Sequence, residues 1–395
     1  MARLVFRRIE QPGREYWAGL GVLAVLAMVG LWAAHVMELE GHVVTGMTNR
    51  VVWGLPHVFA VFLIVAASGA LNAASIASVF GQADYKPYAR LSGLIAIALL
   101  AGGLAVLVLD LGRPDRLIVA MTRYNFASIF AWNIFLYVGF VAIVAAYLVA
   151  MMDRELGRSD RWSKPIGWLA FLWRLVLTTG TGSIFGWLVA REAYDAAVLA
   201  PLFIASSLAL GTAASIPILA ACGRALGEPL LADDMLSRWQ RLLAIFVAAT
   251  LYFTALHHLT NLYASAHHGI ERFLLLEGGG ITQLFWIGQV GIGGVLPLAL
   301  LLLSAPTMAR LNLAAIMVLV GGLAQFYVVI IGGQVYPQTL FPGMEITSSF
   351  HDGEIAPYRA SFYELALGLG GAAFALLLIG IGAALLPFLP RHPAR

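Results

Sequence analysis

The stretch that decides the fold is "LSGLIAIALLAGGLAVLVLDLGRPDRL", residues 91–117. Its apolar run reaches Leu109 and then gives way to Asp110, Arg113, Asp115 and Arg116. A helix needs roughly 20 apolar residues to cross a hydrocarbon core of about 30 Å. We therefore interpret residues 91–109 as a membrane-spanning helix that ends in a charged turn at the membrane edge.

Apolar runs of similar length recur along the 395 residues, of which 61% are hydrophobic and only 11% are charged. Soluble proteins average about 25% charged residues. Backbone groups inside lipid must satisfy their own hydrogen bonds, which favours helices. The sequence therefore predicts an all-α integral membrane protein with about ten transmembrane helices, at residues 17–37, 51–78, 91–109, 128–151, 166–190, 197–221, 242–265, 284–304, 309–331 and 361–386.

Cysteine usage and basic charge limit the cofactors and partners. Cys222 is the single cysteine, which excludes a disulfide framework and a thiolate-held iron–sulfur cluster within this chain. An iron–sulfur centre would therefore belong to a partner. The basic residues of the predicted loops are scattered and do not form a patch, so we expect no nucleic acid partner. The expected surroundings of the chain are the lipid bilayer. The N-terminal segment leads into a full-length span without a small-residue cleavage site, and we interpret it as retained.

The 24 Lys and Arg residues are divided unequally between the two ends of the predicted helices. If the N-terminus is cytoplasmic, sixteen lie on the cytoplasmic side and seven on the opposite side, and Arg174 lies inside the fifth span. Cytoplasmic loops carry an excess of basic residues, so we predict that both termini are cytoplasmic. Eight of the nine histidines then lie at or near the outer side, which we expect to be the functional face.

Two pairs of short segments indicate an internal repeat. "LNAASI" at 71–76 is similar to "GTAASI" at 211–216, and "LIAI" at 94–97 is similar to "LLAI" at 242–245. A duplication would give two parallel four-helix bundles with one flanking helix at each end, although short Ala-rich matches also arise by chance. The predicted division is 1–50 (tail and flanking helix), 51–190 (first bundle, with the site), 191–332 (second bundle) and 333–395 (outer loop and flanking helix).

Trp53 and His57 are spaced i, i+4 and share one face of the second predicted helix near its outer end. An imidazole there can hydrogen-bond a quinone carbonyl and exchange a proton with it, and the indole can stack on the quinone ring. The alternative is an interfacial Trp beside a histidine that bonds a backbone carbonyl. A phenol at Tyr137 is a second candidate donor, although aromatic residues such as Trp132 and Tyr137 are also common at membrane interfaces.

The charged turn at residues 110–116 has two interpretations. Unpaired charge at the membrane edge is costly, so we expect mutual pairing of its aspartates and arginines. Such a turn either acts as a structural clamp between the third and fourth helices, or lines a ligand pocket and docks a partner. Arg174 likewise either reaches the cytoplasmic interface or takes part in a proton path.

Clustered histidines at positions 257, 258, 267 and 268 raise the question of haem or a metal. His257 and His258 are adjacent, so at most one is expected to point at a given site. A dihaem protein also needs paired axial histidines at two depths, and the inner half of the predicted bundle has none. We therefore predict no metal site and disfavour haem, allowing at most a single outer one.

Several motifs resemble the NrfD/PsrC family of quinone-interacting membrane subunits. They are "LDLGRPDR" at 109–116, "FASIFAWNIFLY" at 126–137 and "VAREAYDAAVLAPLFIASSLALG" at 189–211. The segments at 42–72 and 329–371 look most like the ten-helix DsrP-type branch of that family. Where many relatives have histidine in the fifth helix, this chain has "LTTGTGS" at 177–183, which puts a proton path of the family's kind in doubt.

The resemblance implies an outer quinone pocket in the first bundle and no covalently held redox cofactor. The expected ligand is menaquinone or ubiquinone, and the expected partners are a periplasmic ferredoxin-like iron–sulfur subunit, a multihaem cytochrome c and other membrane subunits. His57 is the expected catalytic residue. The remaining candidates are Trp53, Asp110, Arg113, Trp132, Tyr137 and Ser183 for quinone binding, Arg174 and Thr181 for a proton path, and Asp115, Arg116, Gln334, Glu345 and Asp352 for docking.

The sequence thus predicts a membrane subunit of a respiratory complex, in the bacterial inner membrane and concerned with dissimilatory sulfur metabolism. Two alternatives stay open. The chain is an ion- or proton-translocating module, or it is a passive anchor that recruits soluble subunits.

Overall fold

The computed structural model describes residues 5–153, 162–338 and 353–391. Within these ranges ten helices are long and apolar enough to cross a membrane, from Arg14–Glu40 to Phe362–Leu385. They coincide with the ten predicted spans, so the all-α integral membrane fold is confirmed. Glu345 and Asp352, two of the predicted docking residues, lie outside the described residues.

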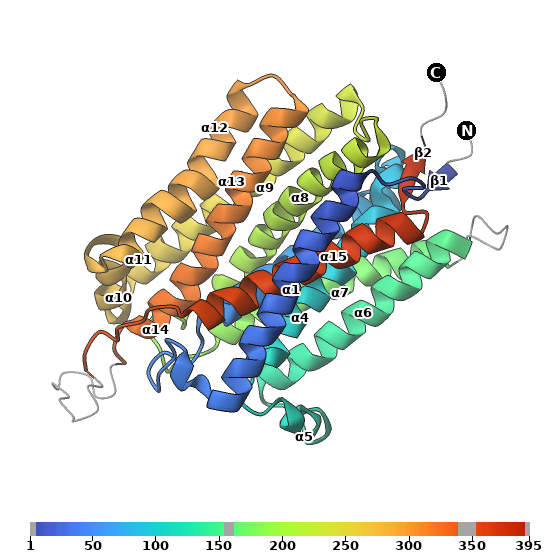
Figure 1. Ribbon diagram of the computed structural model, residues 1–395. Coiled ribbons are helices and arrows are strands. Elements are labelled where there is room, and N and C mark those ends of the chain that lie inside the picture. Colours follow the sequence, from blue (N-terminus) through green and yellow to red (C-terminus); the bar gives the residue numbers. More distant parts are fainter. Residues whose placement is uncertain (1–4, 154–161, 339–352, 392–395) are drawn as a thin grey trace.

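The secondary structure elements carry the labels of Figure 1. In chain order they are β1 (Val5–Arg7), α1 (Arg14–Glu40), η1 (His42–Val44), α2 (Leu55–Ala70), α3 (Asn72–Ser78), η2 (Ala83–Tyr88), α4 (Ala89–Leu109), η3 (Pro114–Arg116), α5 (Leu117–Thr122), α6 (Ile129–Asp153), α7 (Ser163–Gly186), α8 (Leu199–Leu226), α9 (Asp233–Tyr263), η5 (Ser265–His267), α10 (His268–Arg272), η6 (Phe273–Glu277), α11 (Gly280–Gln283), η7 (Leu284–Val295), α12 (Leu296–Leu303), α13 (Met308–Tyr327), η8 (Val328–Gly332), α14 (Gly333–Val335), α15 (Phe362–Leu385) and β2 (Leu389–Arg391).

The start of α2 differs from the predicted span in a way that affects the site. The helix begins at Leu55, with Pro56 in its first turn, whereas the predicted span began at residue 51. Proline suits a first helical turn because its missing N–H would have no partner inside the helix. His57 consequently lies in the first turn of α2, preceded by an irregular segment at residues 45–54.

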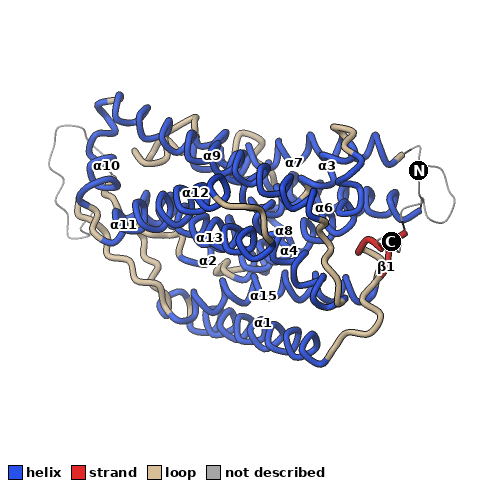
Figure 2. The backbone as a smooth tube through the Cα atoms, turned by 90° about the horizontal axis from the view of Figure 1, so that it is seen from above, coloured by secondary structure: helices blue, strands red, loops and turns tan. Residues whose placement is uncertain are grey.

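The long helices lie side by side and form two contacting groups (Figure 1). In the first group α2 packs on α4 and α7, and α6 packs on both α4 and α7. In the second, α8 packs on α9 and α13, and α12 also contacts α9 and α13. α1 and α15 pair along one edge, where α15 also covers α2 and α4 (Figure 2). This grouping follows the order of the predicted bundles, while the division into two repeats stays a prediction.

Small residues let the two groups approach closely at the crossing of α2 and α8. A Cβ atom added at Gly69 would overlap the main chain of Ser207, and one added at Gly211 would overlap the main chain of Gly69. Close backbone approach at small residues is a common basis of helix association in membranes. Asn72 strengthens the same crossing, because its Nδ2 donates to the Thr212 hydroxyl at 2.8 Å.

The two ends of the chain meet at one end of the molecule. β1 and β2 pair antiparallel, with Phe6 opposite Pro390, and Figure 1 shows both termini there. The opposite end of the bundle, called the distal end below, carries the start of α2 and the ends of α4 and α9. Among the described residues, the histidines of α2 and α9 and the aspartates after α4 that the sequence singled out lie at this distal end.

Candidate functional site

A histidine and carboxylate cluster joins α2 to α4 at the distal end. Nδ1 of His57 lies 2.8 Å from Oδ2 of Asp110, whose side chain is 1% exposed. Nε2 of His42 donates to the main-chain carbonyl of Asp110 at 2.9 Å and lies 3.9 Å from its Oδ1. The His57 side chain is 20% exposed, so one edge of its ring remains accessible. The cluster consists of one buried carboxylate between two partly accessible imidazoles.

The cluster favours the charged form of both Asp110 and His42. Burial by itself raises the pKa of Asp110, but its contacts with His42 and His57 outweigh burial, and the pKa lies below its ordinary value. Hydrogen bonding to Asp110 raises the pKa of His42, against a smaller opposing effect of burial. A buried carboxylate with a low pKa is an anchor that can orient an imidazole and stabilise its protonated form.

Trp53 forms the aromatic side of the site. Its ring stacks near that of His57, with centroids 6.1 Å apart and an interplanar angle of 26°. It also contacts Phe130, Phe185 and Tyr194 at 6.0, 5.7 and 6.2 Å between centroids. Trp53 and His57 are therefore neighbours as expected, but they do not share a helix face, because Trp53 precedes the start of α2 at Leu55. Aromatic residues from three other segments of the chain surround the pair.

Gln334 fixes the backbone that carries Trp53. Its Oε1 accepts hydrogen bonds from the N–H groups of Val52 and Trp53, both at 2.9 Å. Its Nε2 donates to the carbonyls of Trp53 at 2.9 Å and Ile330 at 2.8 Å. The residue is 2% exposed. We expected Gln334 on a docking surface, but the structure places it inside the site as a positioning residue, because its amide matches the polar groups of an irregular backbone segment.

Two further contacts hold the segment at residues 45–55. Arg191 donates to the main-chain carbonyls of Gln334 at 2.9 Å and Arg50 at 2.7 Å. Glu364, which is 0% exposed, accepts from the N–H of Gly46 and from the hydroxyl of Tyr358. The same tyrosine oxygen accepts from the N–H at the start of α2. The loop before α2 is thus attached to the start of α15 and to the segment after α7.

The charged turn after α4 is divided between two environments. Asp110 is buried and pairs with histidines, whereas Arg113 and Asp115 form an exposed bidentate pair at 2.9 and 3.0 Å. Arg116 is also exposed. The expected pairing of aspartates with arginines therefore occurs only at Arg113 and Asp115, because the helix end points Asp110 inward toward α2. Arg113 lies outside the His57 cluster in this arrangement.

The other expected quinone ligands are also separated. Trp132 is 48% exposed and donates from its indole to the carbonyl of Phe126 at 2.9 Å. Tyr137 and Ser183 are buried inside the first group. Ser183 Oγ has no hydrogen-bond partner among the described residues, so a buried polar atom there is left for a bound molecule or water.

A line of polar side chains runs along α7 inside the first group. Arg174, Thr178 and Thr181 are spaced at four and three residues and are all buried. The Arg174 guanidinium donates to Asn72 Oδ1 at 2.6 Å, and the Thr178 hydroxyl donates to that of Ser68 at 2.6 Å. Thr181 lies 3.5 Å from the hydroxyl of Tyr137. Arg174 and Thr178 are therefore joined to α2 and α3, whereas Thr181 contacts Tyr137 and Asn133 of α6, so the two residues expected in a proton path lie on one line but in separate hydrogen-bond groups.

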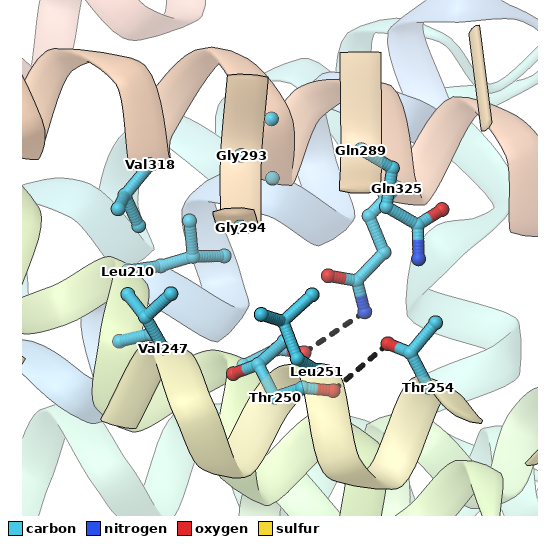
Figure 3. Close-up of a pocket in the computed structure, with 14 residues that line it drawn as sticks. Leu210, Val247, Thr250, Leu251, Thr254, Gln289, Gly293, Gly294, Val318 and Gln325 are labelled. Atoms are coloured by element: carbon cyan, nitrogen blue, oxygen red, sulfur yellow. Dashed lines mark hydrogen bonds between the residues drawn. The ribbon is translucent and has the colours of Figure 1, made fainter. Parts of the chain in front are cut away.

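Two cavities lie outside the His57 cluster. One, of about 30 Å³, opens inside the second group between α8, α9, η7 and α13, and has room for about two waters. Figure 3 shows the polar groups that line it, including Thr254 and Gln325. The other, of about 400 Å³, lies at the distal end beside Gln334 and is lined by Arg50 and Arg191.

Sequence reasoning did not select several residues of the site. His42, Tyr194 and Glu364 are polar residues near the predicted outer side that no local spacing distinguishes as ligands, and Phe185 belongs to no distinguishing pattern. His42 lies 68 residues before Asp110, so no periodicity connects them. The one available signal for Glu364 was the Ser361 to Glu364 spacing of a capping box, which explains its link to its own helix but not to Gly46.

Comparison with known proteins gives a consistent result. The family model described as "Polysulphide reductase, NrfD" matches residues 43–338. The chain is 28% identical to an Hdr-like menaquinol oxidoreductase integral membrane subunit of Archaeoglobus fulgidus, over 98% of this chain and 97% of that protein. It is 24% identical to a subunit of the selenate reductase of Mesobacillus selenatarsenatis, over 93% of each protein. It is 25% identical to one of the polysulfide reductase chains of Wolinella succinogenes, over 73% of this protein and 96% of that one.

Proposed function

This chain belongs to the polysulphide reductase NrfD family, and from that premise we propose that it is the quinone-reactive membrane subunit of a respiratory redox complex. A quinone or quinol binds beside His57 and Trp53, and electrons pass between it and an iron–sulfur subunit docked at the distal end. One observation carries the proposal: the accessible His57 ring contacts the buried Asp110 carboxylate through Nδ1, next to an aromatic surface.

The chemistry of the cluster suits a carrier of electrons and protons. A quinone supplies two-electron chemistry that is coupled to two protons. Because Nδ1 of His57 faces Asp110, its Nε2 is the nitrogen available to a ligand oxygen. Asp110 orients the ring and stabilises the imidazolium when Nε2 takes up a proton. Trp53 provides a flat apolar surface for the head group, and Gln334 fixes the backbone of Trp53.

The remaining candidate residues are assigned to further contacts with the ligand and to the binding of a partner subunit. Ser183 Oγ and the Tyr137 hydroxyl are further polar groups for the ligand or its water. Asp115 and Arg116 are exposed at the distal end and are our candidates for docking the ferredoxin-like subunit. Arg113 shares that surface, and its role in quinone binding stays a prediction.

The orientation and the wider complex are part of the same proposal. Both termini face the cytoplasm of a bacterial inner membrane, so the distal end faces the periplasm, as the basic residues of the loops favour. Menaquinone is the preferred ligand, because one relative is named for menaquinol. Sulfur metabolism of the DsrP type, with a multihaem cytochrome c in the complex, is the proposed setting, and the polysulfide reductase relative supports it.

Proton translocation is a second candidate function, favoured by the line from Arg174 to Thr181. The Arg174 guanidinium is buried and contacts the neutral acceptors Ser68 O and Asn72 Oδ1. Intramembrane charge of this kind is commonly functional. Reconstituted complex with a pH-sensitive dye inside the vesicles would test it. Arg174→Gln should abolish proton movement while quinone turnover persists, and equal proton movement in the variant would exclude this path.

Replacement of His57 tests the main proposal. The assembled complex with His57→Ala should lose at least tenfold in quinone turnover, since general acid–base groups contribute about 10²–10⁴-fold. His268→Ala is the matched control, because that histidine is exposed at the same end and its Nε2 bonds the main-chain carbonyl of Leu262, which is no part of the His57 cluster. Subunit composition and quinone content are measured on both. Normal turnover in His57→Ala would remove the residue from the mechanism, and loss of turnover solely through loss of assembly would favour a passive anchor.

A further inference from the structure

A second cluster of ionisable side chains lies at the distal end of the second helix group, apart from the proposed quinone site. His257 and His258 lie in the last two turns of α9, and Glu271 lies on α10. One ligand atom from each of the three lies within 4.8 Å of the others. Glu271 is 0% exposed, and His257 is 6% exposed. We propose that these three side chains form a binding site for a divalent transition-metal ion of the Zn²⁺ type.

The environment of Glu271 favours the binding of a cation beside its carboxylate. A buried carboxylate is costly unless it is paired. Arg272, its neighbour in sequence, turns away and donates to Glu277 at 2.7 Å. Glu271 instead contacts Nδ1 of His258 at 2.7 Å and accepts from Nδ2 of Asn261 at 2.9 Å. A metal ion would compensate the carboxylate more completely than a single imidazole does.

His257 supplies the second, independent observation. Its Nδ1 is buried and has no hydrogen-bond partner among the described residues. A buried nitrogen without a hydrogen-bond partner is unfavourable, and a neutral imidazole nitrogen is the commonest metal ligand in proteins. The rings of His257 and His258 lie 5.1 Å apart between centroids. The sequence suggested that at most one of the adjacent histidines points at a given site, but a ligand atom of each lies near Glu271, because α10 packs beside the end of α9.

The donor set determines the class of ion. Two imidazoles and one carboxylate suit Zn²⁺ and similar borderline ions better than Ca²⁺ or Mg²⁺, which prefer oxygen ligands. In a tetrahedral Zn²⁺ site, Zn–N and Zn–O bonds of about 2.0–2.2 Å place two ligand atoms about 3.3–3.6 Å apart. The three ligand atoms lie within 4.8 Å of one another, so side-chain rotations that move them by about 1 Å close the set.

The surroundings resemble those of a metal site. Asn261 orients the carboxylate from behind, as groups outside the ligand set commonly do. Phe285 places its ring 4.8 Å from that of His258 and forms an apolar wall. The His258 side chain is 12% exposed, which leaves an entry for an ion from the distal surface. A bound ion would cross-link α9 to α10.

Metal binding to the purified full-length chain tests the proposal. The tag-free protein is treated with chelator, then titrated with Zn²⁺ by calorimetry and with Co²⁺ while its visible absorption is recorded. We expect one ion per chain and Co²⁺ bands typical of nitrogen and oxygen ligands. His257→Ala and Glu271→Gln should each weaken binding at least tenfold. His268→Ala is the control, because His268 lies on α10 but bonds the carbonyl of Leu262, and it should bind as the wild type does.

Thermal unfolding with and without Zn²⁺ is a second measurement that tests the proposal even if a variant is unstable. Saturating Zn²⁺ should raise the Tm of the wild type and of His268→Ala by the same amount, because an ion that binds only the folded state stabilises it. The Tm of Glu271→Gln should not respond. No stoichiometric binding by the wild type, unchanged binding in both site variants, or loss of binding in His268→Ala would each overturn the proposal.

Discussion

Replacing Gln334 by Ala should loosen the turn that carries Trp53. The amide makes four hydrogen bonds of 2.8–2.9 Å, three of them to Val52 and Trp53, which lie 282 and 281 residues earlier in the chain. Val52 is 50% exposed, so in the variant its N–H can form a hydrogen bond with water instead. The N–H and C=O of Trp53 are then the groups that lose their hydrogen-bond partner. A buried polar group without a partner costs about 1–3 kcal/mol. Because Trp53 is only partly buried, we expect a loss of about 2–4 kcal/mol in unfolding free energy.

Two assays separate stability from function in this variant. With an unfolding entropy of about 2 cal/mol/K per residue, a loss of that size lowers the Tm by about 2–5 °C in detergent. Quinone turnover of the assembled complex should fall by more than the Tm change explains, because Trp53 loses its fixed position beside His57. Gln338→Ala is the control, since that side chain is exposed. Unchanged Tm and turnover in Gln334→Ala would refute the positioning role.

Three other predictions follow from individual contacts. The contact between Asp110 and His42 stabilises the fold at pH values between their two pKa values. The contribution of Asp110 is lost as the pH falls through its lowered pKa, and the contribution of His42 is lost as the pH rises through its raised pKa. The Tm difference between wild type and Asp110→Asn should therefore be largest from about pH 4 to 6.5, and a pH-independent difference would contradict the pairing. Gly69→Ala should prevent close packing of α2 and α8 and reduce folded yield, whereas Gly21→Ala, which meets no atom within 4 Å, should not. Tyr358→Phe should lower the Tm by about 1–4 °C, because one hydroxyl both accepts from the start of α2 and donates to Glu364, and an unaltered Tm would show that the hydroxyl is dispensable.

Much of the fold could be predicted from local pattern. Each span is a run of apolar residues long enough to cross the membrane, and lipid allows such a run few structures other than a helix. The ten predicted spans therefore agree with the ten helices. The largest local difference between the predicted and observed helices is at the start of α2. Residues 51–54 are apolar, but they precede Pro56, and their backbone groups form hydrogen bonds with distant side chains instead of forming a helix.

The candidate site could be predicted only where a local spacing defined it. Trp53 and His57 were expected to lie close together, and their rings do stack, but Trp53 lies before the start of α2 and so does not share a helix face with His57. The partner of Asp110 was not predictable, because the nearby arginines were the obvious choice and the histidines come from other segments. Gln334 was expected at the surface because the loop around it is polar, whereas it is buried.

The sequence by itself determined that this protein lies in a membrane and how many spans it has, because apolar length is a local property of the chain. It also indicated that Trp53 and His57 are neighbours. The tertiary structure decided which charges meet. Asp110 lies between His42 and His57, Glu364 bonds the loop before α2, and the two adjacent histidines of α9 converge on one carboxylate. Such pairings join residues on different helices, and inside a membrane each buried polar group must find its partner wherever packing places one.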